Sequence, residues 1–173
     1  YFGAIGPDGL ASTTGNGAYG LRIESAGNQI GGANLGEGNI FMGRGTPMSA
    51  AVWVVGEAAD GNVLEGNRFG VYADGTVGPH TGYYAIRIQG GADATRIGGA
   101  DPGAGNWIAR AQANAIDLGP DSHGTIIEGN RIGTDSTGPL NWGTAGAGIS
   151  FIQDGGISQT VIRRNIIAYS GDV

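Results

Sequence analysis

The sequence predicts an all-β coil in which short strands of successive turns pair in parallel. Thirty-seven of the 173 residues are Gly, about three times the usual share of ~7%. Ile and Val together number 26, whereas Leu and Met number eight, and β-branched residues favour strands over helices. With 40% hydrophobic residues and no Gly-X-Y period, the composition excludes collagen and argues against disorder.

The strongest observation is an internal repeat of about 32 residues. The phrase Gly-Asn-Arg-Phe-Gly at 66–70 recurs as Gly-Asn-Arg-Ile-Gly at 129–133. Five short segments with inward-outward-inward alternation start 31, 34, 30 and 33 residues apart. They are 21–23, 52–54, 86–88, 116–118 and 149–151. Repeats of this length indicate a solenoid in which each unit packs only on its neighbours.

Each unit carries two further predicted strands in a fixed order. The second strand ends at Ile30, Leu64, Ile97, Ile127 and Ile162. The third strand follows an Asn and places an apolar residue two positions later, at Phe41, Phe69, Ile108, Ile132 and Ile167. The Asn residues are Asn39, Asn67, Asn106, Asn130 and Asn165. Stacked at ~4.8 Å, each such position would form a column along the axis.

The loops between units alternate in length. The segments from Phe69 to Ile86 and from Ile132 to Ile149 both span 17 residues, whereas the two others span 11 and eight. The true period is therefore a pair of turns. The fifth unit departs from it, because Ile162 and Asn165 are three residues apart where Ile30 and Asn39 are nine apart.

The Asn column, the Gly-Asn-x-Ile-Gly phrases and Gly-Thr-Asp at 133–135 resemble the right-handed parallel β-helix of the pectin-lyase-like superfamily. More narrowly, they resemble the β-helix repeat proteins of bacterial and archaeal surfaces. The resemblance covers nearly the whole chain. It implies an Asn ladder inside the turn between the second and third sheets, and enzyme sites on the first sheet. It indicates little about function, because the superfamily spans lyases, hydrolases, epimerases, tailspikes and adhesins.

The outward column of the first sheet is a candidate binding surface. It contains Arg22, Trp53, Arg87, Asp117 and Ser150. One interpretation is a saccharide groove in which Trp53 stacks on a sugar and the arginines clamp carboxylates. The other is structural, with Arg22 and Arg87 flanking Trp53 as cation–π neighbours while Arg87 pairs with Asp117. The sequence favours the structural interpretation.

Catalysis would need more carboxylates than this column offers. A glycosidase places two carboxylates roughly 5 to 9.5 Å apart, and the column holds only Asp117. If the chain is an enzyme, the candidates are Arg87, Asp117, Asp121 and His123, the last two from the turn after the strand. The recurring loop residues Asp8, Asp74 and Asp135 could bind calcium, but Asp-Gly and Asp-Ser are turn formers. We therefore expect neither a metal nor a cofactor.

The third sheet offers a second candidate binding column, with Arg68, Trp107 and Arg131 between the apolar residues Tyr1, Ile40 and Ile166. The second-sheet column is Gln29, Val63, Arg96, Ile126 and Val161. Apolar residues pointing outward suggest cover by loops or by a partner, and loops are the simpler interpretation. An ice-binding plane is rejected, because Thr95, Thr125 and Thr160 share the inward parity of the core.

The charge balance and the short apolar runs argue against nucleic acid and a membrane as partners. A net charge of −6, with nine Arg and no Lys, makes nucleic-acid binding a poor interpretation. The longest apolar run, 50–55, is far too short for a membrane helix. We expect residues 1–173 to form one β-helix domain within a longer extracellular or surface chain or filament. Its role would be structural or adhesive, without catalysis; the alternatives are a polysaccharide lyase or hydrolase, or a carbohydrate-binding module.

The two ends are expected to be open. Tyr1-Phe2-Gly3 matches 68–70 and 131–133, so the chain begins within a third strand and finishes shortly after another. Neither end shows a helix or a charged strand that would cover the unpaired edge. The sequence therefore predicts neighbouring turns or subunits stacked end to end.

Overall fold

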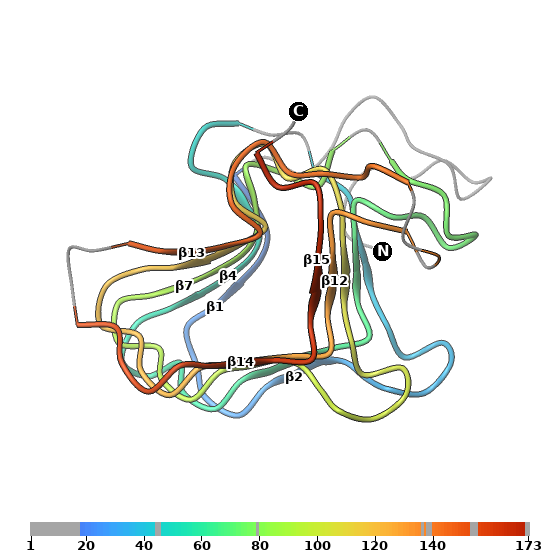
Figure 1. Ribbon diagram of the computed structural model, residues 1–173. Helices are drawn as coiled ribbons and strands as arrows, with labels where there is room; N and C mark the ends of the chain where they lie inside the picture. The colour runs from blue at the N-terminus through green and yellow to red at the C-terminus, as the bar shows by residue number, and fades with distance from the viewer. Residues whose placement is uncertain are drawn as a thin grey trace.

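The computed structural model describes residues 18–43, 46–78, 80–135, 137, 140–152 and 156–171. These residues form fifteen strands and no helix. The strands make three sheets of five, and every pair of neighbouring strands is parallel. The chain visits the three sheets in turn and then repeats the circuit one level higher (Figure 1). The all-β, parallel β-helix prediction is therefore confirmed.

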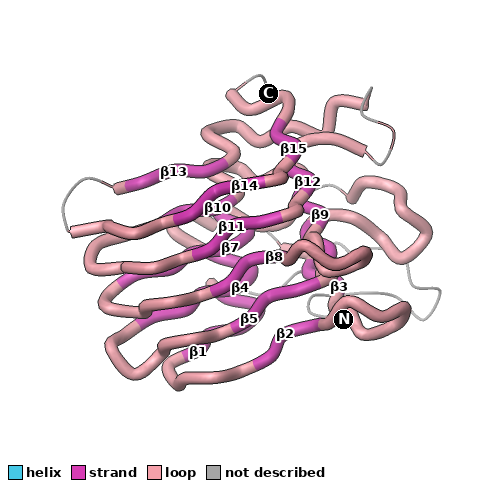
Figure 2. Tube along the Cα trace, turned by 60° about the horizontal axis from the view of Figure 1, so that its bottom comes forward, coloured by secondary structure: helices cyan, strands magenta, loops and turns pink. Residues whose placement is uncertain are grey.

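The strand bounds follow the repeat closely. The first sheet contains β1 (Tyr19–Ile23), β4 (Ala50–Val55), β7 (Tyr84–Gln89), β10 (Ile116–Leu118) and β13 (Ile149–Phe151). The second contains β2 (Gln29–Gly31), β5 (Val63–Glu65), β8 (Arg96–Gly98), β11 (Ile126–Glu128) and β14 (Val161–Arg163). The third contains β3 (Ile40–Phe41), β6 (Arg68–Phe69), β9 (Trp107–Ile108), β12 (Arg131–Ile132) and β15 (Ile166–Ile167). Figure 2 shows these strands stacked as the rungs of three ladders.

The core lies between the three sheets and is built from columns of equivalent residues. In the first sheet Val52 pairs in register with Ile86, which pairs with Ile116, and all three are fully buried. In the third sheet the rings of Phe41 and Phe69 stack with centroids 4.8 Å apart. Burying each such side chain stabilises the fold by about 1.5–3 kcal/mol, so identical inward positions sustain the coil.

The Asn ladder runs through all five turns. The Oδ1 atom of Asn106 accepts hydrogen bonds from the backbone N–H of Asn67 at 2.9 Å and from its side-chain amide at 3.2 Å. Asn106 in turn donates both groups to Asn130 Oδ1, at 3.0 and 2.9 Å. The same pattern joins Asn39 to Asn67 and Asn130 to Asn165. Buried turn amides are satisfied in this way, so the column is structural.

A second corner column was not foreseen from the sequence. Between the first and second sheets, Asn28 donates its backbone N–H and side-chain amide to Asn62 Oδ1, at 2.8 and 2.9 Å. The preceding residue has a positive φ in every turn, including the non-glycines Ala94 and Gln159. In the later turns Thr replaces Asn, and Thr95 and Thr125 are fully buried. Their inward direction agrees with the parity argument against an ice-binding plane.

The two ends of the described stack differ. In the last turn the inward residues Phe151, Ile162 and Ile167 are 45%, 44% and 44% exposed. In the first described turn Ile23 and Ile30 are 6% and 7% exposed. Core side chains are thus exposed at β13–β15 and covered at β1–β3. That further turns or subunits stack on the two ends stays a prediction. The match of Tyr1-Phe2-Gly3 to a third strand lies outside the described residues.

Within the described part of the chain, no helix is long and apolar enough to cross a membrane.

Candidate functional site

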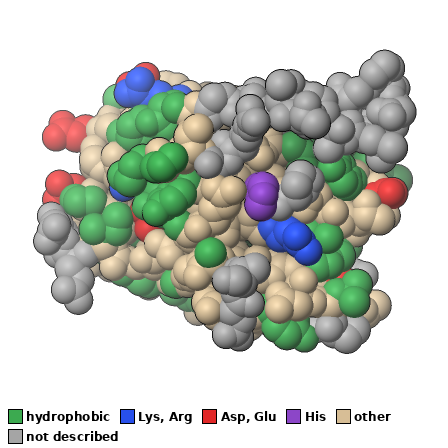
Figure 3. Space-filling model, turned by 90° about the horizontal axis from the view of Figure 1, so that it is seen from above, with side chains coloured by type: hydrophobic (Ala, Val, Ile, Leu, Met, Phe, Trp, Pro, Cys, Tyr) green, Lys and Arg blue, Asp and Glu red, His purple; other side chains and the backbone are tan. Residues whose placement is uncertain are grey.

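The outer face of the first sheet carries the column that the sequence singled out. Arg22 pairs in register with Trp53, Trp53 with Arg87, and Asp117 with both Arg87 and Ser150. Hydrophobic side chains gather on one side of the face shown in Figure 3, with charged side chains at their border. This face combines aromatic and charged groups, so it is the first place to look for a ligand site.

The aromatic part of this face is a stacked pair. The Tyr19 and Trp53 rings lie 4.7 Å apart with an interplanar angle of 29°. The Arg22 guanidinium lies 4.9 Å from the Trp53 ring centroid and also pairs with Glu24 at 2.7 Å. The predicted cation–π contact of Arg22 is therefore confirmed. That of Arg87 is different, because its guanidinium lies 5.0 Å from the ring of Tyr84 instead.

The only acid of the column is paired. Asp117 is fully buried although it points outward, and its Oδ1 atom accepts a hydrogen bond from the Asn114 amide at 2.9 Å. Its Oδ2 atom lies 3.2 Å from Arg87 Nε as an ion pair. The carboxylate therefore neutralises the charge of the largely buried Arg87 guanidinium, which agrees with the structural interpretation of the column.

Burial and the negative charge of Asp117 also change the pKa of Tyr84. Tyr84 is 7% exposed. Burial, followed by the negative charge of Asp117, raises the pKa of its hydroxyl, while the Arg87 guanidinium lowers it. The neutral phenol is the form that this environment favours.

The other two catalytic candidates belong to a different corner. Asp121 is exposed and has a φ of 58°, a conformation typical of a turn. His123 lies between the first and second sheets, where its backbone N–H donates to Asp93 Oδ1 at 2.7 Å. Its Nδ1 atom lies 2.8 Å from Ser158 Oγ. Asp117 contacts Arg87 and Asn114, whereas His123 contacts Asp93 and Ser158. The two candidates therefore have no contact residue in common.

The outward column of the third sheet is partly covered by the long loops that follow it, as expected. Ile40 is 8% exposed, and Trp142, from the loop after β12, packs edge-on against Trp107 with ring centroids 6.5 Å apart. Val71, Val77, Ala109 and the two tryptophans form a satellite apolar cluster. Trp107 is therefore a packing residue beneath loops rather than an open platform. Ile166 stays 46% exposed.

The arginines of this column differ from those of the other sheets. Arg22 and Arg87 pair with carboxylates on the first sheet. Arg96 pairs with Glu65, and Arg163 and Arg164 pair with Glu128, along the second sheet. Within the described part of the chain, Arg68 and Arg131 have no carboxylate within ion-pair distance; instead, each directs Nη1 toward a backbone carbonyl of the following loop.

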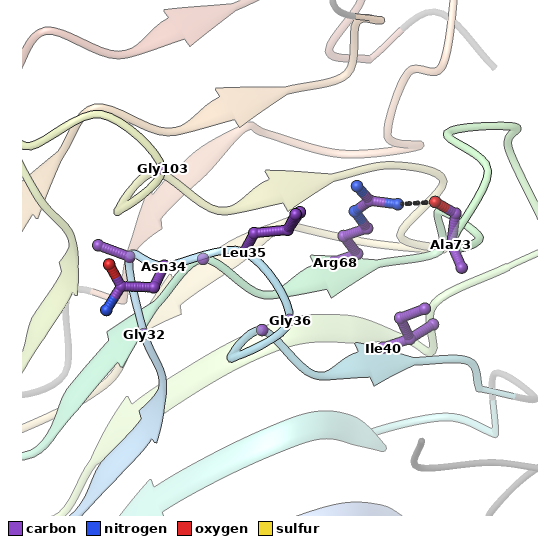
Figure 4. Close-up of a pocket in the computed structure, with 11 residues that line it drawn as sticks. Gly32, Asn34, Leu35, Gly36, Ile40, Arg68, Ala73 and Gly103 are labelled. Atoms are coloured by element: carbon purple, nitrogen blue, oxygen red, sulfur yellow. Dashed lines mark hydrogen bonds between the residues drawn. The ribbon is translucent and has the colours of Figure 1, made fainter.

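A cavity of about 570 Å³ lies beside Arg68. Its walls come from the loop 32–38 and from Gly103, with Gly66 between them, and Ile40, Arg68 and Ala73 line one end. Figure 4 shows Arg68 between Leu35 and Ala73, with its guanidinium bonded to the Ala73 carbonyl. Sequence reasoning missed this cavity, because it arises where a tight turn, 65–67, lies between two long loops. The available signal was the spacing between the second strand and the ladder Asn, which is nine residues at Ile30–Asn39 and three at Leu64–Asn67.

The loop aspartates act as turn residues. Asp74 Oδ1 accepts hydrogen bonds from the backbone N–H of Thr76 at 2.9 Å and from its hydroxyl at 2.7 Å, and these bonds lower the pKa of Asp74. Asp135 Oδ1 accepts the backbone N–H of Leu140 at 3.2 Å. Asp8 lies outside the described residues. Among the described residues no cluster of three or more His, Asp or Glu could hold a metal ion.

Comparison of the chain with protein-family models, with curated proteins and with solved structures finds no match.

Proposed function

We propose that the chain is a structural or adhesive segment of an extracellular β-helix, such as a stalk, a fibre or a surface-protein repeat, of the pectin-lyase-like type. The observation that carries this proposal is the buried Arg87–Asp117 pair with Asn114. The position where an enzyme of this fold would display reactive carboxylates instead holds one acid, fully buried and neutralised by its neighbour.

The rest of the molecule supports a scaffold role. The Asn ladder and the apolar columns repeat at every turn, so stiffness along the axis comes from interactions that each turn makes with the next. The exposed inward side chains of β13–β15 favour the addition of further strands on that edge.

The test is a search for cleavage. The protein is incubated with polygalacturonate, alginate and hyaluronan, with and without calcium, and product is followed by absorbance of unsaturated ends and by reducing-end release. We expect none above the level of an Arg87→Ala, Asp117→Ala double variant. Reproducible cleavage that the double variant abolishes would replace this proposal by the lyase or hydrolase alternative.

A carbohydrate-binding role is a second candidate, favoured by the stacked pair Tyr19–Trp53. Tyr19 is 37% exposed, so the pair presents aromatic surface beside the Arg22 guanidinium. Glycan-array binding that is lost in Trp53→Ala and kept in Trp142→Phe, a change under the loops of the third sheet, would support this role. Binding that is equal in both variants would argue against it.

A further inference from the structure

The Arg68 guanidinium is held rigidly at one end of the cavity. Its Nη1 atom donates to the backbone carbonyls of Tyr72, at 2.8 Å, and of Ala73. Its central carbon lies 5.4 Å from the centroid of the Trp107 ring. Trp107 is itself fixed by Trp142 and packs close to the loop at Gly75. The arginine therefore loses little further side-chain freedom when a ligand binds.

The opposite edge of the same guanidinium is uncommitted. An arginine has five N–H donors, and the hydrogen bonds of Arg68 to Tyr72 and Ala73 both come from Nη1. Nε and Nη2 have no hydrogen-bond or ion-pair partner among the described residues. Asp74, in the neighbouring loop, is engaged with Thr76 instead. Nε and Nη2 form the side-on fork that binds two oxygens of one oxyanion.

The cavity walls are fixed by close backbone contacts. A Cβ on Gly66 would lie 2.1 Å from the Gly32 carbonyl oxygen, and one on Gly103 would lie 2.2 Å from the Ala33 carbonyl oxygen. The loop 32–38 and Gly103 therefore stack against the tight turn without room for side chains. Gly36, Gly38 and Gly103 are exposed at the cavity, so their peptide groups can bond polar groups of a ligand.

From these observations we propose that the cavity between loop 32–38 and Arg68 binds a small oxyanion-bearing ligand. Its carboxylate, phosphate or sulfate group is held by the Nε and Nη2 atoms of Arg68. The net charge of −6 does not prevent this, because the residues that line the cavity include Arg68 and no acid. The nearby carboxylates of Glu37 and Asp74 are bonded within their own loops, to Asn34 and Thr76. This binding site is independent of the scaffold role, which does not require it.

The experiment is calorimetric titration of the 173-residue chain with inorganic phosphate, sulfate, glucuronate and glucose, together with NMR of the Arg68 Nε–H resonance. We expect at least one of the three anions to bind and to shift that resonance, and neutral glucose to do neither. The anion that binds most tightly shows whether the ligand group of this site is a phosphate, a sulfate or a carboxylate. Arg68→Met should weaken that anion about ten- to a hundredfold, as expected for a lost charge-assisted bidentate contact.

Control variants distinguish a specific contact at Arg68 from a general effect of removing positive charge or of unfolding. Arg131→Met removes the equivalent arginine two turns away, and Arg110→Gln removes an exposed one; both should bind like wild type. Arg68→Lys keeps the charge but loses the fork, so its affinity should lie between those of wild type and Arg68→Met. The proposal is overturned if no anion binds at millimolar concentration, if glucose binds equally, or if a folded Arg68→Met or Arg68→Lys protein binds as wild type does.

Discussion

At the scale of single residues, the fold depends on polar side chains that close corners as much as on apolar ones that fill the interior. Asn106 is fully buried and takes part in six hydrogen bonds. Two go to Asn130, two come from Asn67, one goes to the Leu64 carbonyl, and its own carbonyl accepts one from the Arg131 backbone N–H. A leucine of similar size would leave the Asn67 amide and the Leu64 carbonyl unpaired. The ladder is therefore a place where a hydrophobic substitution is harmful.

We expect Asn106→Leu to lower the free energy of unfolding by about 1–3 kcal/mol for each buried group that loses its partner. The measurement is urea unfolding followed by circular dichroism. Asn39→Leu is the matched control: Asn39 is half-buried and, among the described residues, donates to Asn67 without accepting from another ladder Asn. It should cost clearly less. Equal losses for the two variants would contradict a cooperative ladder.

Tyr84 gives a pH prediction at the same scale. In the unfolded chain its hydroxyl loses a proton near pH 10, while burial and the Asp117 charge raise its pKa in the folded state. Above about pH 10 the folded state thus binds more protons, and the free energy of unfolding falls as the pH rises. No Lys or Cys titrates in this range. Tyr84→Phe should flatten the decline between about pH 9 and pH 11 in urea titrations; an unchanged slope would contradict the prediction.

At the scale of elements, the turns decide where loops can stack. Gly66 and Gly61 have the same φ of 63°, but only Gly66 lies against other backbone, whereas a Cβ on Gly61 meets nothing within 4 Å. In the column of Gly61 the chain itself uses Ala94 at a φ of 53°. A positive φ is therefore tolerated without glycine at the corner of Gly61, between the first and second sheets. At the corner of Gly66, between the second and third sheets, the close approach of other backbone requires glycine.

Gly61→Ala should cost about 1–2 kcal/mol, the penalty of a left-handed conformation. Gly66→Ala should cost more than this, because its Cβ would force the Gly32 carbonyl and the loop 32–38 to move. Thermal and urea unfolding of the pair measure the difference directly. If both variants lose the same stability, the tight stacking of these loops is not a constraint on the fold.

The elements were largely predictable and the surfaces between loops were not. Strand positions follow from period-2 alternation repeated at about 32 residues, and register follows from the Asn column, because one slip would turn every Ile outward. The cover over Trp107 depends on where loops of different lengths fold back. So does the contact of Arg87 with Tyr84 rather than with Trp53. The alternating spacing before the ladder Asn indicates where the cavity at Arg68 lies, but its shape depends on the relative position of three turns, which the spacing does not give.

At the scale of the whole molecule, the two ends of the described stack differ, and core side chains are exposed only at the β13–β15 end. β13, β14 and β15 each pair with only one neighbouring strand in the described sheets, and the inward side chains of this last turn are close to half exposed. Core columns that end in solvent combine apolar surface with unpaired backbone groups, the features that favour strand addition. At the other end Ile23, Ile30 and Phe41 are buried.

This asymmetry predicts how the isolated chain associates. If only one end exposes its core, two copies can join by their β13–β15 edges around a two-fold axis, and such an isologous contact closes at a dimer rather than growing into a filament. Sedimentation velocity over a range of concentrations should therefore show monomer and dimer. Ile162→Glu with Ile167→Glu places charges on the inward columns and should give monomer, whereas Val161→Glu, on the outward face of the same strand and 41% exposed, should leave the dimer. A monodisperse monomer at high concentration, or filaments in negative stain, would show that this edge does not govern assembly.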